Sequence, residues 1–195
     1  MNVDITLPDG SVRSYESPVT GYQIAESIGP RLLKDAICIE IDNKFQDLSF
    51  EISENINVRI VTTKDLDALH ILRHSSAHIL AQAVLNLYPN AQFGVGPSIE
   101  NGFYYDFLFE TPIKENELEN IEKEMKRIAK SAQSFIRSEI TKKDAEKIFK
   151  NQKLKLELIE SAESDEGVGE EIVSTYSNDE FIDLCMGPHV PSTSS

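Results

Sequence analysis

The sequence is short of cysteine, of long apolar runs and of basic residues, and each shortage excludes a class of protein. Its 195 residues include two cysteines, too few for a disulfide framework, which indicates a reducing compartment. No apolar run approaches the roughly 20 residues of a membrane-spanning helix. The start, MNVDITLPDG, lacks the basic and apolar regions of a secretory signal. We therefore expect a cytoplasmic protein without a membrane partner.

The net charge of −14 argues against nucleic-acid binding by the chain as a whole, because phosphate binding depends on Lys and Arg. The charge is unevenly distributed. Between Lys123 and Lys155 there are eleven Lys and Arg residues against four Asp and Glu. A solvated helical face with paired charges explains this stretch as well as a strip facing nucleic acid does, so both interpretations stay open.

The first part of the chain predicts a small domain over residues 1–62. Two strands, 2–7 and 11–16, alternate around the turn signal Pro8-Asp9-Gly10. Thr20 is a candidate N-cap of a helix that ends near Gly29. Further strands are predicted at Ile37–Ile41, where Cys38 is expected to be a core thiol, and at Leu48–Ile52 and Ile56–Val61. This order of elements is typical of a β-grasp domain.

Residues 63–195 predict a larger second domain, so that the fold class is α+β. A helix is expected over about Asp65–Tyr88, and Asn101-Gly102 predicts a hairpin after it. The glycine-rich run at Phe93–Pro97 lacks the Gly-Lys-Ser/Thr ending of a P-loop, and close backbone packing is the better interpretation. The remaining predictions are helices over residues 115–131 and from Thr141 onward, strands at Phe135–Ile140, Leu154–Leu158, Ile172–Tyr176 and Glu180–Leu184, and a loop over 160–171.

Two spaced pairs of residues carry the chemistry that the sequence predicts. His74 and His78 lie four apart on one face of the predicted helix. Cys185 and His189 are also four apart, and Gly187-Pro188 between them predicts a turn. Three of the four histidines and one of the two cysteines thus form a HxxxH and a CxxxH pair.

These pairs have several chemical interpretations. Buried histidines with ordinary hydrogen bonds are the simplest one. Zinc ligation is the second, because two or three His with a Cys suits that metal. A metalloprotease motif is excluded, since it needs Glu directly after its first His, where this chain has Ser75. A zinc site and a metal-free hydrolytic pocket remain.

Longer strings around these pairs carry a specific resemblance. RHSSAHILAQAV, FGVGPSIENGFYYDF and DLCMGPHVPST resemble the editing domain of bacterial-type threonyl-tRNA synthetases, and the first and last also resemble the editing domain of alanyl-tRNA synthetases. The region before them resembles the TGS domain, a ubiquitin-like module that opens the threonyl enzymes. Because no stretch resembles the class II aminoacylation motifs, we expect an N-terminal fragment of a longer synthetase.

The resemblance implies post-transfer editing, the hydrolysis of Ser-tRNA(Thr) to serine and tRNA(Thr). A pocket chosen for threonine rejects serine by only about 10- to 200-fold, the worth of one methyl group, so a second step is needed. By resemblance, His74 and Lys155 position and polarise the water and the tRNA terminus. The substrate is held by His78, Cys185 and His189, Asp183 orients an imidazole or binds the serine amine, and Tyr105 lines the pocket.

The resemblance also implies cofactors and partners. Threonyl-type members work without metal at this site, and the Lys155 ammonium would be repelled by Zn²⁺, which favours a metal-free site. Zinc at His74, His78, Cys185 and His189, in a tRNA-binding module without chemistry, is the alternative. For Lys155 the structural alternative is an outward-facing strand lysine. The implied partners are the acceptor end of tRNA(Thr) carrying serine, the remainder of the synthetase and, for the full-length enzyme, a second copy.

Overall fold

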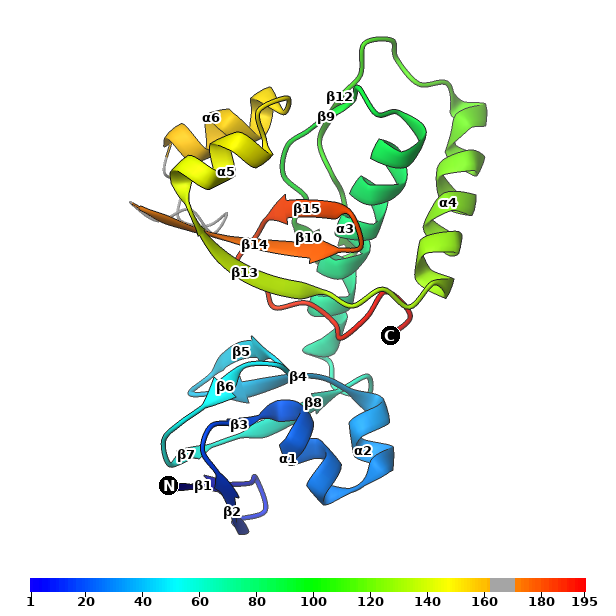
Figure 1. The fold of residues 1–195 in the computed structure, drawn as a ribbon. Helices are drawn as coiled ribbons and strands as arrows, with labels where there is room; N and C mark the ends of the chain where they lie inside the picture. The colour runs from blue at the N-terminus through cyan, green and yellow to red at the C-terminus, as the bar shows by residue number, and fades with distance from the viewer. Residues whose placement is uncertain (162–170) are drawn as a thin grey trace. The chain divides into compact units, whose positions relative to one another are not determined.

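A computed structural model describes residues 1–161 and 171–195 (Figure 1). Contacts divide the chain into two compact units, Met1–Leu72 with Pro188–Pro191, and Arg73–Gly187 with Ser192–Ser195. Helices and small sheets are mixed in both, which confirms the α+β fold class. Among the described residues, no helix combines the length and the apolar character that crossing a membrane requires.

The first unit begins with the predicted hairpin. Strands β1 (Asn2–Thr6) and β2 (Val12–Glu16) pair antiparallel, and β7 (Ile56–Asn57) adds to β1 in parallel. Val3 and Ile5 are buried on alternate positions of β1, as the period of two requires. Gly10 has a φ of +81°, a conformation that glycine adopts without steric cost, which explains the turn.

The helix α1 (Gly21–Ile28) has the predicted ends. The Thr20 hydroxyl accepts from the backbone N–H of Gln23, and the Gln23 side chain accepts from the Thr20 N–H, which completes a capping box. A second helix, α2 (Pro30–Asp35), follows directly beside α1 and was not predicted (Figure 1). It buries no residue completely, so its sequence carries no apolar period to detect.

The remaining strands of the first unit correct two predictions. The sheet β5-β4-β8 is built from β4 (Ala36–Ile41), β5 (Lys44–Asp47) and β8 (Arg59–Thr62), and β3 (Val19–Thr20) pairs with β6 (Glu51–Ile52). The single strand predicted at 48–52 is thus only β6, and β5 precedes it. The strand predicted at 56–61 is two strands, β7 and β8, which belong to different sheets. Asp42 and Asn43, both with positive φ, form the tight turn that the prediction missed.

Cys38 lies at the centre of the β5-β4-β8 sheet and is fully buried. Burial, with a smaller contribution from the Asp47 carboxylate, raises the pKa of its thiol to about 12. Since the thiolate is the reactive form of cysteine, Cys38 is an inert core residue, as predicted.

In the second unit, the predicted histidine-bearing helix is α3 (Ala68–Leu87), which ends before Pro89. The helix α4 (Leu118–Lys130), with the short 3-10 helix η1 (Glu115–Glu117) before it, runs beside α3 (Figure 1). Its apolar residues Ile121 and Ile128 pack in one cluster with Ile79, Ala83 and Val84 of α3. The helix predicted over residues 115–131 is thus confirmed as α4, preceded by η1.

The main sheet of the second unit is antiparallel, with the order β13-β14-β15, from β13 (Ile136–Thr141), β14 (Ile172–Asn178) and β15 (Phe181–Leu184). Two helices, α5 (Lys142–Ile148) and α6 (Lys153–Ser161), share its core with α3. The strand predicted at 154–158 is wrong, because this segment lies in α6. Its buried residues, Lys155 and Ile159, are four apart, so the apparent alternation was one face of a helix. The loop predicted over 160–171 lies mostly outside the described residues.

Two short hairpins lead from α3 to η1. The pair β9 (Gln92–Phe93) and β12 (Phe107–Leu108) encloses the predicted hairpin, β10 (Ser98–Ile99) with β11 (Gly102–Phe103). The predicted close packing of the glycine-rich run is confirmed at Gly96, where an added Cβ would lie 2.1 Å from the Tyr105 ring. Only glycine permits that approach, so Gly96 fixes where the Tyr105 ring lies.

Candidate functional site

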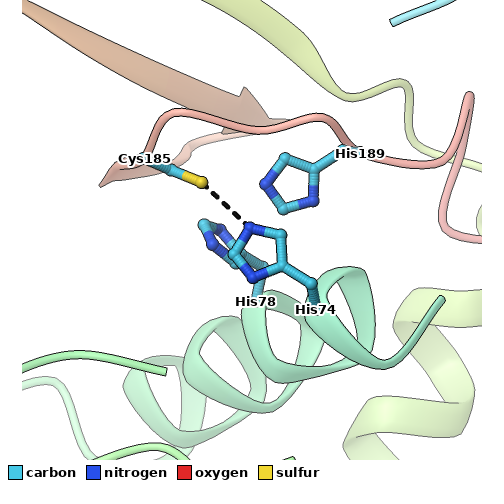
Figure 2. A group of neighbouring side chains, drawn as sticks. All are labelled: His74, His78, Cys185 and His189. Atoms are coloured by element: carbon cyan, nitrogen blue, oxygen red, sulfur yellow. Dashed lines mark hydrogen bonds between the residues drawn. The ribbon is translucent and has the colours of Figure 1, made fainter. Parts of the chain in front are cut away.

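The two predicted histidines share one face of α3. Their ring centroids lie 5.0 Å apart, and His78 is buried whereas His74 is half-buried. Cys185 follows directly after β15, and its Sγ lies 3.0 Å from Nε2 of His74 (Figure 2). The sheet therefore brings the cysteine to the helix across 111 residues of sequence.

His78 is surrounded by aromatic rings, with Tyr105, Phe135 and Phe181 in edge-on contact. Burial lowers its pKa from 6.5 to about 3, although the Asp183 carboxylate, 3.6 Å from Nδ1, acts in the opposite direction. The imidazole is therefore neutral at pH 7, so it has one nitrogen that donates and one that accepts or binds metal.

Behind His78 lies a buried group of charged and polar side chains. The ammonium of Lys155 is 2.5 Å from Oδ1 of Asp183, and the two side chains are 0% and 1% exposed. The Tyr105 hydroxyl donates to Oδ2 of the same carboxylate and accepts from Lys155 at 3.2 Å. The ammonium also lies 4.8 Å from the centre of the Phe93 ring. A buried cation needs such a matched anion, so the outward-facing alternative for Lys155 is wrong.

The turn after β15 explains the predicted Gly187. Its φ is +79°, and an added Cβ would lie 1.9 Å from the Tyr176 hydroxyl, so no other residue fits. Its N–H donates to Sγ of Cys185 at 3.2 Å, which holds the sulfur in place. His189 belongs to the Pro188–Pro191 segment of the first unit, where its backbone N–H donates to Asp47.

The four residues of the two motifs can be tested as a metal site. One nitrogen or sulfur atom from each of His74, His78, Cys185 and His189 lies within 4.8 Å of the others. Three imidazoles and a thiol are ligands that zinc prefers, and neutral His78 is in the form that binds metal. The charge of Lys155 is matched by Asp183, which weakens the repulsion that the sequence suggested. The donor set therefore fits zinc.

Of the seven predicted residues, the six that belong to the second unit thus lie in or directly against one cluster. Sequence reasoning missed Ser174, which holds Cys185 in two ways: its carbonyl accepts from the Cys185 N–H at 3.1 Å, and its hydroxyl donates to the Cys185 carbonyl at 2.7 Å. It also missed Phe93, the ring against the ammonium of Lys155. Neither residue belongs to a spaced motif, and their roles arise from strand pairing that no local pattern reveals.

Comparison with known proteins identifies relatives of this chain. A family described as "Threonyl and Alanyl tRNA synthetase second additional domain" matches residues 173–195, which contain Asp183, Cys185 and His189. Threonine-tRNA ligase of Francisella philomiragia is 47% identical over 99% of this chain. The chain is a homologue of the threonine-tRNA ligases. Those of Ralstonia nicotianae and Burkholderia multivorans are 46% and 48% identical over 98% of the chain, and the chain spans about 30% of the length of each relative.

Proposed function

We propose that the second unit hydrolyses the ester of Ser-tRNA(Thr) that a threonine-tRNA ligase forms in error. The observation that carries this proposal is the buried Lys155 ammonium, held by Asp183 and Tyr105 beside the neutral imidazole of His78. Buried charges beside a histidine whose pKa is strongly lowered are typical of active sites. Homology to ligases that act on threonine, which differs from serine by one methyl group, supplies the substrate.

The proposed chemistry needs a positioned water, a group that accepts its proton and donors for the developing oxyanion. His74 is the half-buried imidazole of the cluster, and in this proposal it accepts the proton of the attacking water. An ammonium has three hydrogens, of which Lys155 uses one in its hydrogen bond to Tyr105, and the charge is paired with Asp183. Another N–H of this ammonium is proposed to donate to the carbonyl oxygen of the ester.

The other residues are proposed to hold the substrate. His78, Cys185 and His189 bind the terminal adenosine and the seryl group, and Tyr105 forms part of the pocket wall. For Asp183 the contacts favour one of the two predicted roles. Both its oxygens are engaged, by Lys155 and by Tyr105, and Oδ2 also faces Nδ1 of His78, so it supports the cluster and does not bind the serine amine directly.

A second candidate function is a zinc-stabilised tRNA-binding module without chemistry, which the compact donor set favours. In that case His74, His78, Cys185 and His189 would hold the metal. Bound zinc with these four ligands would supply folding free energy, as a closed structural site does. Editing of the alanyl type is disfavoured, because the three relatives named above, which match 98–99% of this chain, are threonine-tRNA ligases.

The wider assignments also belong to the proposal. We propose a TGS-like accessory domain over residues 1–62 and an editing domain over 63–195. The proposed partners are the acceptor end of tRNA(Thr) and the remainder of the synthetase. The full-length enzyme is proposed to be a cytoplasmic homodimer. The relatives, which are about three times longer, leave room for the aminoacylation machinery.

The experiment measures hydrolysis of Ser-tRNA(Thr) and Thr-tRNA(Thr) by the purified chain, with and without a chelator. We expect serine to be released, threonine to be spared and the chelator to have no effect. Substitutions His74→Ala and Lys155→Met should each slow the reaction by roughly 10²- to 10⁴-fold. The control is Lys153→Met, the same change at an exposed position of α6. Equal hydrolysis of both esters would refute editing. One zinc ion bound per chain, together with no hydrolysis of either ester, would support the second candidate function.

A further inference from the structure

Three side chains of α3 on successive turns meet three residues of the β14–β15 region in order. His74 meets Cys185, with 3.0 Å between Nε2 and Sγ, and His78 meets Asp183, with 3.6 Å between Nδ1 and Oδ2. Gln82, one turn further along the helix, accepts from Nδ2 of Asn178 at 2.7 Å. The first two contacts belong to the site already described, and the third lies outside it.

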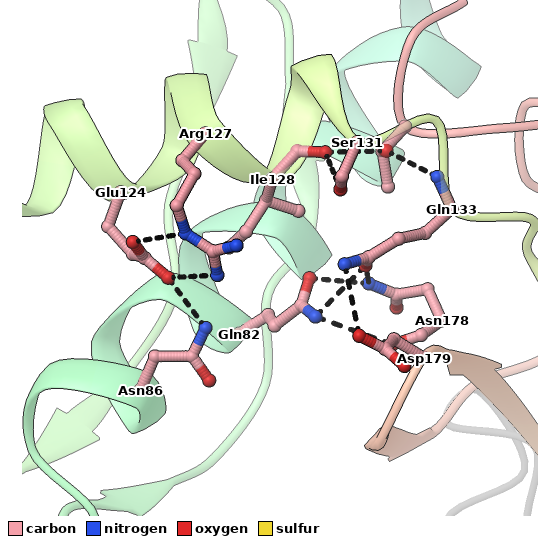
Figure 3. A network of polar contacts seen from close by, with 10 residues as sticks. Gln82, Asn86, Glu124, Arg127, Ile128, Ser131, Gln133, Asn178 and Asp179 are labelled. Atoms are coloured by element: carbon pink, nitrogen blue, oxygen red, sulfur yellow. Dashed lines mark hydrogen bonds and ion pairs between the residues drawn. The ribbon is translucent and has the colours of Figure 1, made fainter.

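The third contact is part of a buried amide network (Figure 3). Gln82 and Asn178 are 4% and 1% exposed. Nε2 of Gln82 donates to the Asn178 carbonyl at 3.4 Å and to Oε1 of Gln133 at 3.0 Å, which also accepts from Nδ2 of Asn178 at 3.3 Å. Nε2 of Gln133 donates to Asp179 at 3.4 Å. Directional hydrogen bonds in such a dry environment fix the relative positions of the three segments that they join.

The network holds the one turn that sets the register of β15. Asn178 is the last residue of β14 and pairs with Phe181, so Asp179 and Glu180 form the turn, with Asp179 at a φ of +56°. The same register pairs Tyr176 with Asp183. Since a slip of one residue moves every side chain of a strand to the opposite face, an error at this turn would carry Asp183 away from Lys155 and His78.

The neighbouring contacts of α3 show that this role is local to Gln82. Asn86, one turn further along, is exposed and donates to Glu124 of α4 at 2.7 Å (Figure 3). It therefore ties α3 to α4. Apolar contacts of α3 with the sheet, such as those of Ala77 and Ala81, set the spacing of the two elements. Burial of Phe181 and Leu184 also favours the observed register, and the amide network adds directional hydrogen bonds at the turn itself.

We infer that Gln82 and Asn178 are positioning residues of the site, which set the register in which β15 presents Asp183 and Cys185 to the two histidines of α3. The expected change in kcat rests on the proposed function. The expected change in the geometry of the site can be measured without any substrate. Misplacement of reacting groups by about 1 Å can cost on the order of 100-fold in rate. Asn178→Ala should therefore lower kcat of Ser-tRNA(Thr) hydrolysis by about 10- to 100-fold, with little change in KM.

The experiment compares Asn178→Ala, Gln82→Asn and the exchange Gln82→Asn/Asn178→Gln, with Asn86→Ala as the matched control. The exchange keeps both amides and the total length of the pair, so it should restore kcat, whereas Asn86→Ala should leave kcat unchanged. In parallel, ¹⁵N-edited spectra of the imidazole nitrogens of His74 and His78 report the geometry of the site without substrate. Asn178→Ala and Gln82→Asn should shift these resonances, and the exchange variant and Asn86→Ala should not.

The outcomes separate the two proposals. Wild-type protein without hydrolysis would refute the proposed function, and the imidazole spectra would still decide the role of the network. Imidazole resonances that are unchanged in Gln82→Asn, or equally shifted in Asn86→Ala, would refute the positioning role. If Asn178→Ala does not fold, the comparison of Gln82→Asn with the exchange variant gives the same decision.

Discussion

Ion pairs occur in two contrasting places in the second unit. On α4 they lie at the surface, where Lys126 pairs with Glu122 at side-chain exposures of 67% and 64%. At the site, Lys155 pairs with Asp183 at exposures of 0% and 1%. Exposed pairs contribute about 0–1 kcal/mol, whereas the loss of one partner of a buried pair typically costs about 3–5 kcal/mol. A Lys–carboxylate pair thus affects the free energy of unfolding little at the surface and strongly when it is buried.

This contrast resolves part of the ambiguity of the basic stretch between Lys123 and Lys155. On α4, Lys123, Lys126 and Arg127 each pair with a glutamate three or four residues earlier, as a solvated helical face does. Lys155, at the other end of the stretch, is part of a buried cluster. Counting charges along the sequence treats these residues alike. It therefore cannot distinguish the solvated face of α4 from the buried cluster around Lys155.

The largest expected effect tests the buried pair. Lys155→Met keeps much of the volume of the side chain but leaves the Asp183 carboxylate buried without its cation. We expect it to lower the free energy of unfolding by about 3–5 kcal/mol. Asp183→Asn added to Lys155→Met removes the stranded charge and should recover part of this loss. Urea unfolding of both single variants and the double variant measures the coupling, and a loss below about 1 kcal/mol in Lys155→Met would mean that water reaches the pair.

The next effect separates a metal-free cluster from a zinc site. In a metal-free cluster, Cys185→Ala removes a partly hydrogen-bonded thiol and should cost less than about 2 kcal/mol, with weaker substrate binding as the main consequence. The melting temperature of the wild-type protein should then be the same with and without a chelator. In a zinc site, the chelator and the substitution would each release the metal and destabilise the unit strongly. Thermal melts together with elemental analysis distinguish these results.

Burial of His78 predicts an acid-sensitive fold. The folded state has a pKa of about 3 for this group and the unfolded state one near 6.5, so the unfolded state binds more protons between these values. The stability that His78 contributes is present above pH 6.5 and is lost as the pH falls. By pH 5 the loss should reach about 2 kcal/mol. His78→Asn should flatten the dependence of unfolding free energy on pH between 7 and 5, and the same substitution at the exposed His70 serves as control.

Sequence alone predicted the elements that carry a strong local pattern. The capping residue Thr20, the helix that bears His74 and His78, and the helix α4 all followed from spacing and propensity. Lys155 shows where this reasoning fails. Its segment, Leu-Lys-Leu-Glu-Leu, alternates like a strand, although Leu, Lys and Glu all favour helices, and the buried residues Lys155 and Ile159 have helical spacing.

The site was predicted only through its spaced motifs and its family resemblance. Spacing found the two His and Cys pairs, because each pair lies within one local segment. The partners of these residues come from elsewhere in the chain: Lys155 lies 28 residues before Asp183 and on a different element, and Ser174 contacts Cys185 across a strand pair. The amide network of Gln82, Gln133 and Asn178 has no sequence signal, since uncharged polar residues are common on surfaces.

The smallest expected effect tests the exposed side of the comparison. Lys126→Ala removes a surface pair of α4 and should change the free energy of unfolding by no more than about 0.5 kcal/mol, because solvent screens such pairs. Charge reversal, Lys126→Glu, distinguishes the two interpretations of this face. If α4 contacts tRNA phosphates, reversal should weaken binding and reduce the slope of log affinity against log salt by about 0.9 for each lost duplex contact. Because Glu122 already pairs with this lysine, we expect the slope to stay constant. Titration of tRNA(Thr) at several salt concentrations measures it, with Arg13→Glu in the first unit as a reversal of equal charge for comparison.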